Sequence, residues 1–302
     1  MFGRTNRVGK VVYVENSALC LGALFNSKNI QKSQHVVILM KQDSSFLIKP
    51  SIVVHWYRDD SMIGFWLAIA IIISWFASLT FLLLENSFSM SWLEISVGIG
   101  IRVFLHTGLF IIAHDAMHNS LLPRYPRVNN LIGRFAVSLY ASLSYRHCQI
   151  NHSRHHRYPY QKQDPDFHHG YPHPICWYVR FIYTYLPSSE FPRFFISGGM
   201  TFFVLSTVAQ VSPINLLLFW IFPLLLSSIQ LFFFGTYLPH RDRELIRSSR
   251  YPVCWSLLTC YHFGYHEEHH CFPQIPWYRL PALYRSSQKK IQEDRQITKH
   301  TA

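Results

Sequence analysis

The chain has few charged residues, and it lacks the motifs by which soluble proteins bind dinucleotides or nucleic acids. Charged side chains make up 15% of its 302 residues, whereas apolar side chains make up 49%. No G-x-G-x-x-G loop and no flavin or ferredoxin motif is present, so any electrons that the chain uses must come from another protein. The net charge of +12 is not arranged as a recognisable nucleic-acid-binding motif. We therefore expect no nucleic-acid partner, and one membrane-embedded domain in place of two soluble ones.

Disulfide and signal-peptide patterns are absent too. The six cysteines form no C-x-x-C pair, and most lie in or beside segments that we assign to the cytoplasm, where thiols stay reduced. Residues 1–50 are polar and basic and have no hydrophobic signal-peptide core. We expect residues 1–58 to be a loosely ordered cytoplasmic extension, or the product of a misplaced start codon, and residues 59–302 to form the membrane domain.

Long hydrophobic runs are what the sequence has in place of these patterns. Residues 63–84 contain no charge, and about 20 apolar helical residues suffice to cross the hydrocarbon core of a bilayer. A buried helix of a soluble protein is the alternative that this length disfavours. Three further runs predict membrane spans: 92–113, 194–211 and 214–238. Pro223 is tolerated in the last of them if a neighbour binds the carbonyl that it frees. We therefore predict an all-α integral membrane protein with about four transmembrane helices.

The distribution of lysine and arginine assigns the two sides of the membrane. The linkers 85–91 and 210–213 contain neither residue, whereas 114–193 and the tail after 239 are rich in arginine. By the positive-inside rule, both termini and both basic segments are cytoplasmic, and their charge is attracted to the anionic membrane face. The apolar run 131–145 is short and contains Arg134, so we expect it to lie at the interface without crossing.

Eight of the eighteen histidines fall into three clusters on this predicted cytoplasmic side. The clusters are His114 and His118 in AHDAMH, His152, His155 and His156 in NHSRHH, and His266, His269 and His270 in HEEHH. Spacings of three and four residues place the side chains of each cluster on one helical face. One such pair alone is more often solvated surface than a metal site. Here the last two spans form a hairpin that returns the chain to the face it left, so the three clusters can converge.

So many imidazoles at one membrane surface need partners, and they exceed the needs of one zinc ion, which takes three or four protein ligands. They suit two metals, and an imidazole-rich site without thiolates indicates non-haem iron. HEEHH also fits the zinc-protease pattern H-E-x-x-H, in which His266 and His270 bind zinc and Glu267 is the general base. We favour the ligand triplet, because a protease would not need the other clusters. A metal transporter would place its ligands near the bilayer midplane, whereas these clusters lie at the ends of the predicted spans.

Several segments resemble one known family. The three clusters match the histidine boxes of the membrane fatty-acid desaturase and hydroxylase superfamily. More narrowly, TGLFIIAHDAMH, QDPDFH, LFFFGTYLPHR, SLLTCYHFGYHEEHH and FPQIPWYRLP are similar to segments of the bacterial-type β-carotene ketolases. The resemblance covers roughly residues 60–285, and HDAMH, YLPH and CYHFGYHEEHH together are not shared with acyl-lipid desaturases. The sequence differs at Asn119, where the family commonly has glycine, and in its N-terminal extension.

The resemblance implies a diiron, dioxygen-dependent enzyme that oxidises C4 of the β-ionone ring to a ketone, from β-carotene to echinenone and canthaxanthin. It implies two non-haem iron ions, O2 as co-substrate, a carotenoid substrate in the bilayer, and an external, ferredoxin-like electron-donor protein. The histidine-rich site would be a cytoplasmic cap on the membrane helices. A carotenoid hydroxylase or a fatty-acid desaturase on the same scaffold is the alternative, and the product separates these activities.

The metal ligands that the resemblance implies are His114, His118, His152, His155, His156, His240, His266, His269 and His270. His240 of YLPH is the ninth member, and Thr236, one turn earlier, lies where relatives in the wider superfamily place another ligand. Ligand histidines need an acceptor for their second ring nitrogen. Asp164 and Asp166 of QDPDFH are the first candidates for this role in the catalytic site, followed by Asp115, Glu267 and Glu268. We expect His262 to support the site and His106 to be a packed intramembrane residue.

Overall fold

The computed structural model describes residues 61–168, 170, 173–242 and 246–289. Within these ranges every regular element is a helix and there is no strand, which confirms the all-α class. The elements are α2 (Ser61–Leu84), α3 (Trp92–Met117), α4 (Pro126–Ala141), α5 (Tyr145–Arg157), α6 (Pro174–Tyr185), α7 (Phe191–Thr207), α8 (Pro213–Leu216), η2 (Leu217–Ile221), α9 (Phe222–Gln230), η3 (Leu231–Tyr237), α10 (Leu238–His240), α11 (Val253–Cys260), α12 (His266–Cys271) and η4 (Trp277–Arg279). The predicted extension, residues 1–58, lies outside the described residues.

Three helical stretches of the described chain are long and apolar enough to cross a membrane: Met62–Leu84, Trp92–Met117 and Pro213–His240. They match the first, second and fourth predicted spans. The predicted third span corresponds to α7, which has 17 residues and no buried side chain. At about 1.5 Å per residue such a helix is near the lower limit for a crossing, so the total of four spans stays a prediction.

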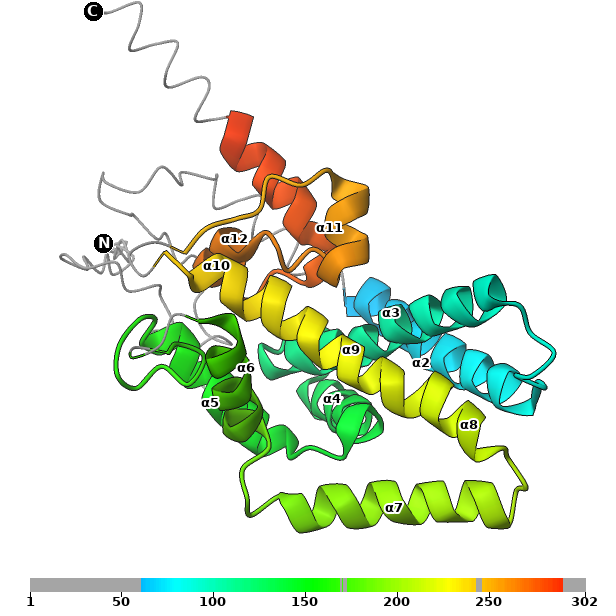
Figure 1. The fold of residues 1–302 in the computed structure, drawn as a ribbon. Helices are drawn as coiled ribbons and strands as arrows, with labels where there is room; N and C mark the ends of the chain where they lie inside the picture. Colours follow the sequence, from blue (N-terminus) through cyan, green and yellow to red (C-terminus); the bar gives the residue numbers. More distant parts are fainter. Residues whose placement is uncertain (1–60, 169, 171–172, 243–245, 290–302) are drawn as a thin grey trace, which may run out of the picture.

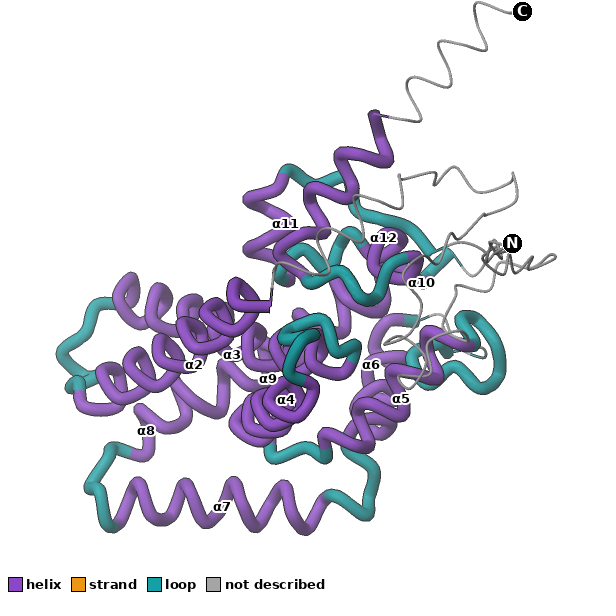
Figure 2. The backbone as a smooth tube through the Cα atoms, turned by 180° about the vertical axis from the view of Figure 1, so that it is seen from behind, coloured by secondary structure: helices purple, strands orange, loops and turns teal. Residues whose placement is uncertain are grey.

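The two ends of the helix bundle differ in what they carry. In Figures 1 and 2 the linker between α2 and α3 and the linker between α7 and α8 lie at one end of the molecule. Helices α5, α10 and α12, which contain most of the clustered histidines, lie at the other end. The linkers without lysine or arginine are thus separated from the histidine-rich end, as the charge pattern predicts. The assignment of that end to the cytoplasm stays a prediction.

A buried arginine joins the three long spans. Pro223 has no N–H, so the carbonyl of Phe219 loses its α-helical partner. Nε of Arg102 on α3 donates to this carbonyl at 3.0 Å. Nη1 of the same side chain donates to the carbonyl of Trp75 at 2.6 Å and to the hydroxyl of Ser78 at 2.9 Å, both on α2. The charge that interrupts the second apolar run therefore satisfies the carbonyl that the proline frees, as expected of a neighbouring helix.

Helix α4 packs across α3 and closes the bundle beneath the histidines. Gly133 makes this approach possible, because a Cβ at this position would lie 2.5 Å from the Cβ of Ala116. His106 links α3 to both α2 and α4: its Nδ1 accepts from Nε1 of Trp75 at 3.0 Å, and its Nε2 donates to the carbonyl of Tyr140 at 2.7 Å. Both ring nitrogens of His106 are therefore used in packing, as predicted for this residue.

Candidate metal centre

The clustered histidines are carried by four helices that end at one place. His114 lies in the last turn of α3, and His118 is the C-cap residue of this helix. Helix α5 starts where the hydroxyl of Ser144 caps the backbone N–H of His147. Before α12 the chain reverses at Tyr261 and His262, whose φ angles are +46° and +67°. This reversal turns HEEHH back toward α5.

The structure brings all nine predicted histidines together, and it divides them into two groups. The first group contains His114, His118, His152, His156 and His269, and the second contains His155, His240, His266 and His270. Within each group the nearest ring nitrogens all lie within 4.8 Å of one another. Helices α5 and α12 each contribute to both groups, so the two groups are neighbours. This division did not follow from the sequence.

The first group has the nitrogen spacing of a metal site. Nε2 of His152 lies 2.7 Å from Nε2 of His118 and 3.1 Å from Nε2 of His156. Nε2 of His156 lies 3.0 Å from Nε2 of His269. A metal–nitrogen bond of about 2.1 Å places two ligands at right angles about 3.0 Å apart. Nε2 of His114 is buried without a hydrogen-bond partner in the described part of the chain, as expected of a nitrogen reserved for a metal ion.

The second group has the same spacing with four members. Nε2 of His270 lies 2.9 Å from Nε2 of His155 and 3.1 Å from Nε2 of His266, and Nε2 of His240 lies 2.9 Å from Nε2 of His266. A neutral imidazole nitrogen either donates or accepts one hydrogen bond, so three converging nitrogens cannot all be satisfied by one another. A cation at their centre would accept every lone pair. The residues present therefore fit two metal ions.

Burial keeps these imidazoles in the form that binds metals. Burial lowers the pKa of His118 and His266 to about 3, and neighbouring histidines contribute further. Both side chains are therefore uncharged at neutral pH, which leaves a lone pair for a cation.

Asp164 lies where the sequence places an orienting carboxylate. Its Oδ1 accepts from Nδ1 of His155 at 2.8 Å. The backbone N–H groups of Tyr160 and Asp166 donate to the same carboxylate, each at 2.9 Å. Because a carboxylate only accepts, Nδ1 of His155 carries the proton and Nε2 presents its lone pair to the second group. This geometry suits the predicted supporting role of Asp164.

Asp166 has a different position from Asp164. Its Oδ2 lies 3.9 Å from Nδ1 of His155, beyond a hydrogen bond. Its Oδ1 accepts from the hydroxyl of Tyr185 at 2.8 Å, and its carbonyl accepts from Nε1 of Trp177. Burial raises the pKa of Asp166 to about 6. The direct orientation of a ligand expected from both aspartates is therefore visible for Asp164 only.

The other candidate carboxylates also differ in whether they lie near a clustered histidine. Asp115 is buried, with Oδ1 3.5 Å from Nδ1 of His114 and Oδ2 accepting from the backbone N–H of Trp277. Glu268 is also buried and accepts from the hydroxyls of Ser248 and Ser287.

Glu267, the general base of the protease hypothesis, is only half-buried and does not line the pocket beside the histidines. The two histidines that a protease would use share their group with His155 and His240. The geometry therefore favours the ligand triplet. His262 contacts the rings of Tyr265 and Trp277 in place of a ligand histidine.

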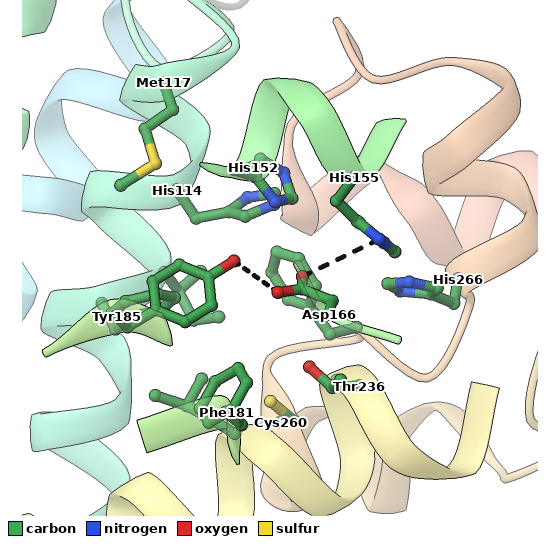
Figure 3. Close-up of a pocket in the computed structure, with 15 residues that line it drawn as sticks. His114, Met117, His152, His155, Asp166, Phe181, Tyr185, Thr236, Cys260 and His266 are labelled. Carbon is green, nitrogen blue, oxygen red and sulfur yellow. Dashed lines mark hydrogen bonds and ion pairs between the residues drawn. The ribbon is translucent and has the colours of Figure 1, made fainter. Parts of the chain in front are cut away.

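A pocket opens beside both groups (Figure 3). Histidines of the first and second groups form one side of it, and apolar residues form much of the rest: Phe110, Ile111, Met117, Phe181, Leu231 and Phe263. Tyr185 and Thr236 also line it, and no motif in the sequence pointed to Tyr185.

Known proteins are similar in sequence to this chain over most of its length. Residues 88–203 and 172–301 match the family described as fatty acid desaturase. A β-carotene ketolase of Paracoccus sp. strain N81106 is 41% identical over 235 residues, which cover 73% of this chain and 88% of the relative. A β-carotene ketolase of Paracoccus sp. strain PC1 is 40% identical over 233 residues, 74% of this chain and 92% of the relative. A zeaxanthin 4-ketolase of Chlamydomonas reinhardtii is 34% identical over 231 residues, 73% of this chain and 51% of the relative.

The residues that match the family model include the nine histidines and the residues that line the pocket beside them. The chain belongs to the fatty acid desaturase family and, within it, to the β-carotene ketolases.

Proposed function

We propose that the chain is a membrane-bound ketolase that oxidises C4 of the β-ionone ring of β-carotene. The observation that carries this proposal is the pocket, which has histidines of both groups on one side and apolar walls on the others. A hydrocarbon ring suits such walls, and the relatives named above are ketolases of carotenoids. The active site faces the cytoplasm, so the substrate enters from the bilayer while electrons arrive from a ferredoxin-like protein.

The two histidine groups would each hold one iron ion. When bound, the irons would supply the activation of dioxygen, for which two electrons per turnover come from the donor protein. The protein's own part is to fix the ligands and to present the substrate. Asp164 keeps His155 in the tautomer whose Nε2 faces its group. Phe110, Phe181 and Phe263 exclude water and hold the ring against the histidines.

The reaction needs two oxidations of one carbon. In the first, one C4–H bond becomes C4–OH; one oxygen atom of O2 enters the alcohol, and the other leaves as water with two electrons and two protons. A second, identical oxidation gives a geminal diol, which loses water to form the ketone. C4 is the reactive position because loss of its hydrogen atom leaves an allylic radical, which is resonance-stabilised.

The proposal is tested by producing the chain in cells that accumulate β-carotene and identifying the pigment. A carbonyl at C4 extends the polyene conjugation, so absorption is expected to move to longer wavelength, with echinenone appearing before canthaxanthin. Cells that carry the vector without the gene provide the control. Accumulation of zeaxanthin would identify a hydroxylase, and new double bonds in membrane acyl chains with untouched carotene would identify a desaturase.

Metal analysis provides a second prediction. Because the nine histidines form two groups with metal-like nitrogen spacing, the purified protein is expected to contain about two irons per chain. Elemental analysis of protein extracted in mild detergent measures this ratio. Active protein with one tightly bound zinc and no iron would contradict the diiron site and return HEEHH to the protease hypothesis.

A further inference from the structure

The pocket beside the histidines contains few polar groups that are not candidate metal ligands. Among the 15 residues drawn in Figure 3, four are ligand histidines, and only Asp166, Tyr185 and Thr236 add other side-chain oxygens. The remaining lining residues are apolar side chains, one glycine and one cysteine. Polar groups that are rare in a pocket of this kind fix the orientation of a ligand and decide which ligand is accepted.

Two of these oxygens are free to bind a substrate. The hydroxyl of Tyr185 donates a hydrogen bond to Oδ1 of Asp166, so the lone pairs of its oxygen remain available as acceptors. Thr236 lies in the π-helical turn η3 and is 6% exposed. Its hydroxyl makes no hydrogen bond to any residue that the structure describes. In Figure 3 the oxygens of Tyr185 and Thr236 point into the pocket from different walls.

A C4 ketolase needs such groups, because its first product is an alcohol. A hydroxyl in an apolar pocket is costly unless it forms hydrogen bonds, so a pocket suited only to hydrocarbon would release the alcohol before its second oxidation. We propose that Thr236 and Tyr185 bind the C4 alcohol and hold it for conversion to the ketone. This inference rests on the proposed function and names the residues that decide between the two products.

The two hydroxyls have complementary roles in this binding. The oxygen of Tyr185 accepts a hydrogen bond from the C4 hydroxyl, and the hydroxyl of Thr236 donates one to the C4 oxygen. Neither residue gains or loses a proton or an electron, so both are positioning residues. With the C4 oxygen held between the two walls, the remaining C4–H bond stays on the side of the ligand histidines.

The variant Thr236→Val removes the hydroxyl and keeps the shape of the side chain. In cells that make β-carotene, we expect the ratio of 4-hydroxy to 4-keto products to rise about tenfold, because one hydrogen bond to the alcohol is lost. Tyr185→Phe is expected to change the ratio in the same direction. Thr236→Ser, which keeps the hydroxyl, should return the ratio close to that of the unchanged chain.

Two exposed positions provide matched controls: Thr207→Val on α7 and Tyr183→Phe on α6. Both should leave the product ratio and the iron content unchanged. With purified holoenzyme, Thr236→Val should raise the KM for 4-hydroxy-β-carotene about tenfold and the KM for β-carotene much less. A purely structural defect would instead raise both KM values together or lower the iron content.

The outcomes separate this inference from the proposed function. If the unchanged chain makes echinenone and both variants keep its alcohol-to-ketone ratio, the inference is overturned and the proposed function stands. If the unchanged chain makes no product oxidised at C4, both are overturned.

Discussion

Substitution of alanine for His155 is expected to abolish the oxidation of β-carotene, with a loss of more than about a thousandfold in turnover. His155 connects the second group to its carboxylate support, because its Nε2 lies 2.9 Å from Nε2 of His270 and its Nδ1 bonds to Asp164. Without it three histidines remain in that group. The measurement is ketone formation per chain in purified, membrane-extracted protein, together with its iron content, which is expected to fall.

The same experiment decides between the two hypotheses for HEEHH. Glu267→Gln is the informative partner, since this half-buried residue does not line the pocket. We expect it to keep most of the activity, and His173→Ala, an exposed histidine outside both groups, to serve as the histidine control. Full activity of His155→Ala with loss of activity in Glu267→Gln would refute the diiron centre.

Gly235→Leu is expected to lower β-carotene turnover by about a hundredfold while the iron content stays near two per chain. Gly235 lines the pocket, and a Cβ built on it meets no atom within 4 Å. The larger side chain therefore occupies the space for the ring without disturbing the packing, and a small displacement of a substrate is enough for a loss of this size. Gly235→Ala should have an intermediate effect, so activity should fall with side-chain size.

Gly100→Leu is the matched control for this substitution. Gly100 also has no atom within 4 Å of a built Cβ, but it is an exposed residue of α3 outside the pocket. Turnover of this variant is expected to equal that of the unchanged chain. Unchanged turnover in Gly235→Leu as well would show that the substrate ring binds elsewhere.

Most residues of the candidate metal centre were predictable, because the spacing of the histidines marks them in the sequence. Helical spacing identifies His152, His155 and His156 as one cluster. The hairpin topology of the last spans indicates that the clusters meet. His240 has no partner at helical spacing, so only the resemblance to a family could name it. The separation of His155 from its neighbours His152 and His156 into another group depends on how α5 faces α12, which no local pattern encodes.

Contacts between distant segments could not be predicted from the sequence for the same reason. Arg102 reads as a charge that interrupts an apolar run, and its partner, the carbonyl of Phe219, lies 117 residues away. Tyr185 stands in an ordinary aromatic helix, and only the packing of α6 places its hydroxyl beside Asp166. Helix α7 shows the opposite limit. Its composition predicts a span, but its 17 residues leave the crossing undecided by length.

The π-helical turn η3 sets the rotation of the last span, and this rotation decides whether His240 faces the candidate metal centre. Within Leu231–Tyr237 the helix has π geometry, and His240 follows three residues later, with Nε2 2.9 Å from Nε2 of His266. An α-helix rotates about 100° per residue, so loss of a single residue between Pro223 and His240 would turn this imidazole to another face. Ordinary membrane helices absorb such a deletion by a change in tilt. Here a shortened helix could still insert, yet it would do so with a ligand missing.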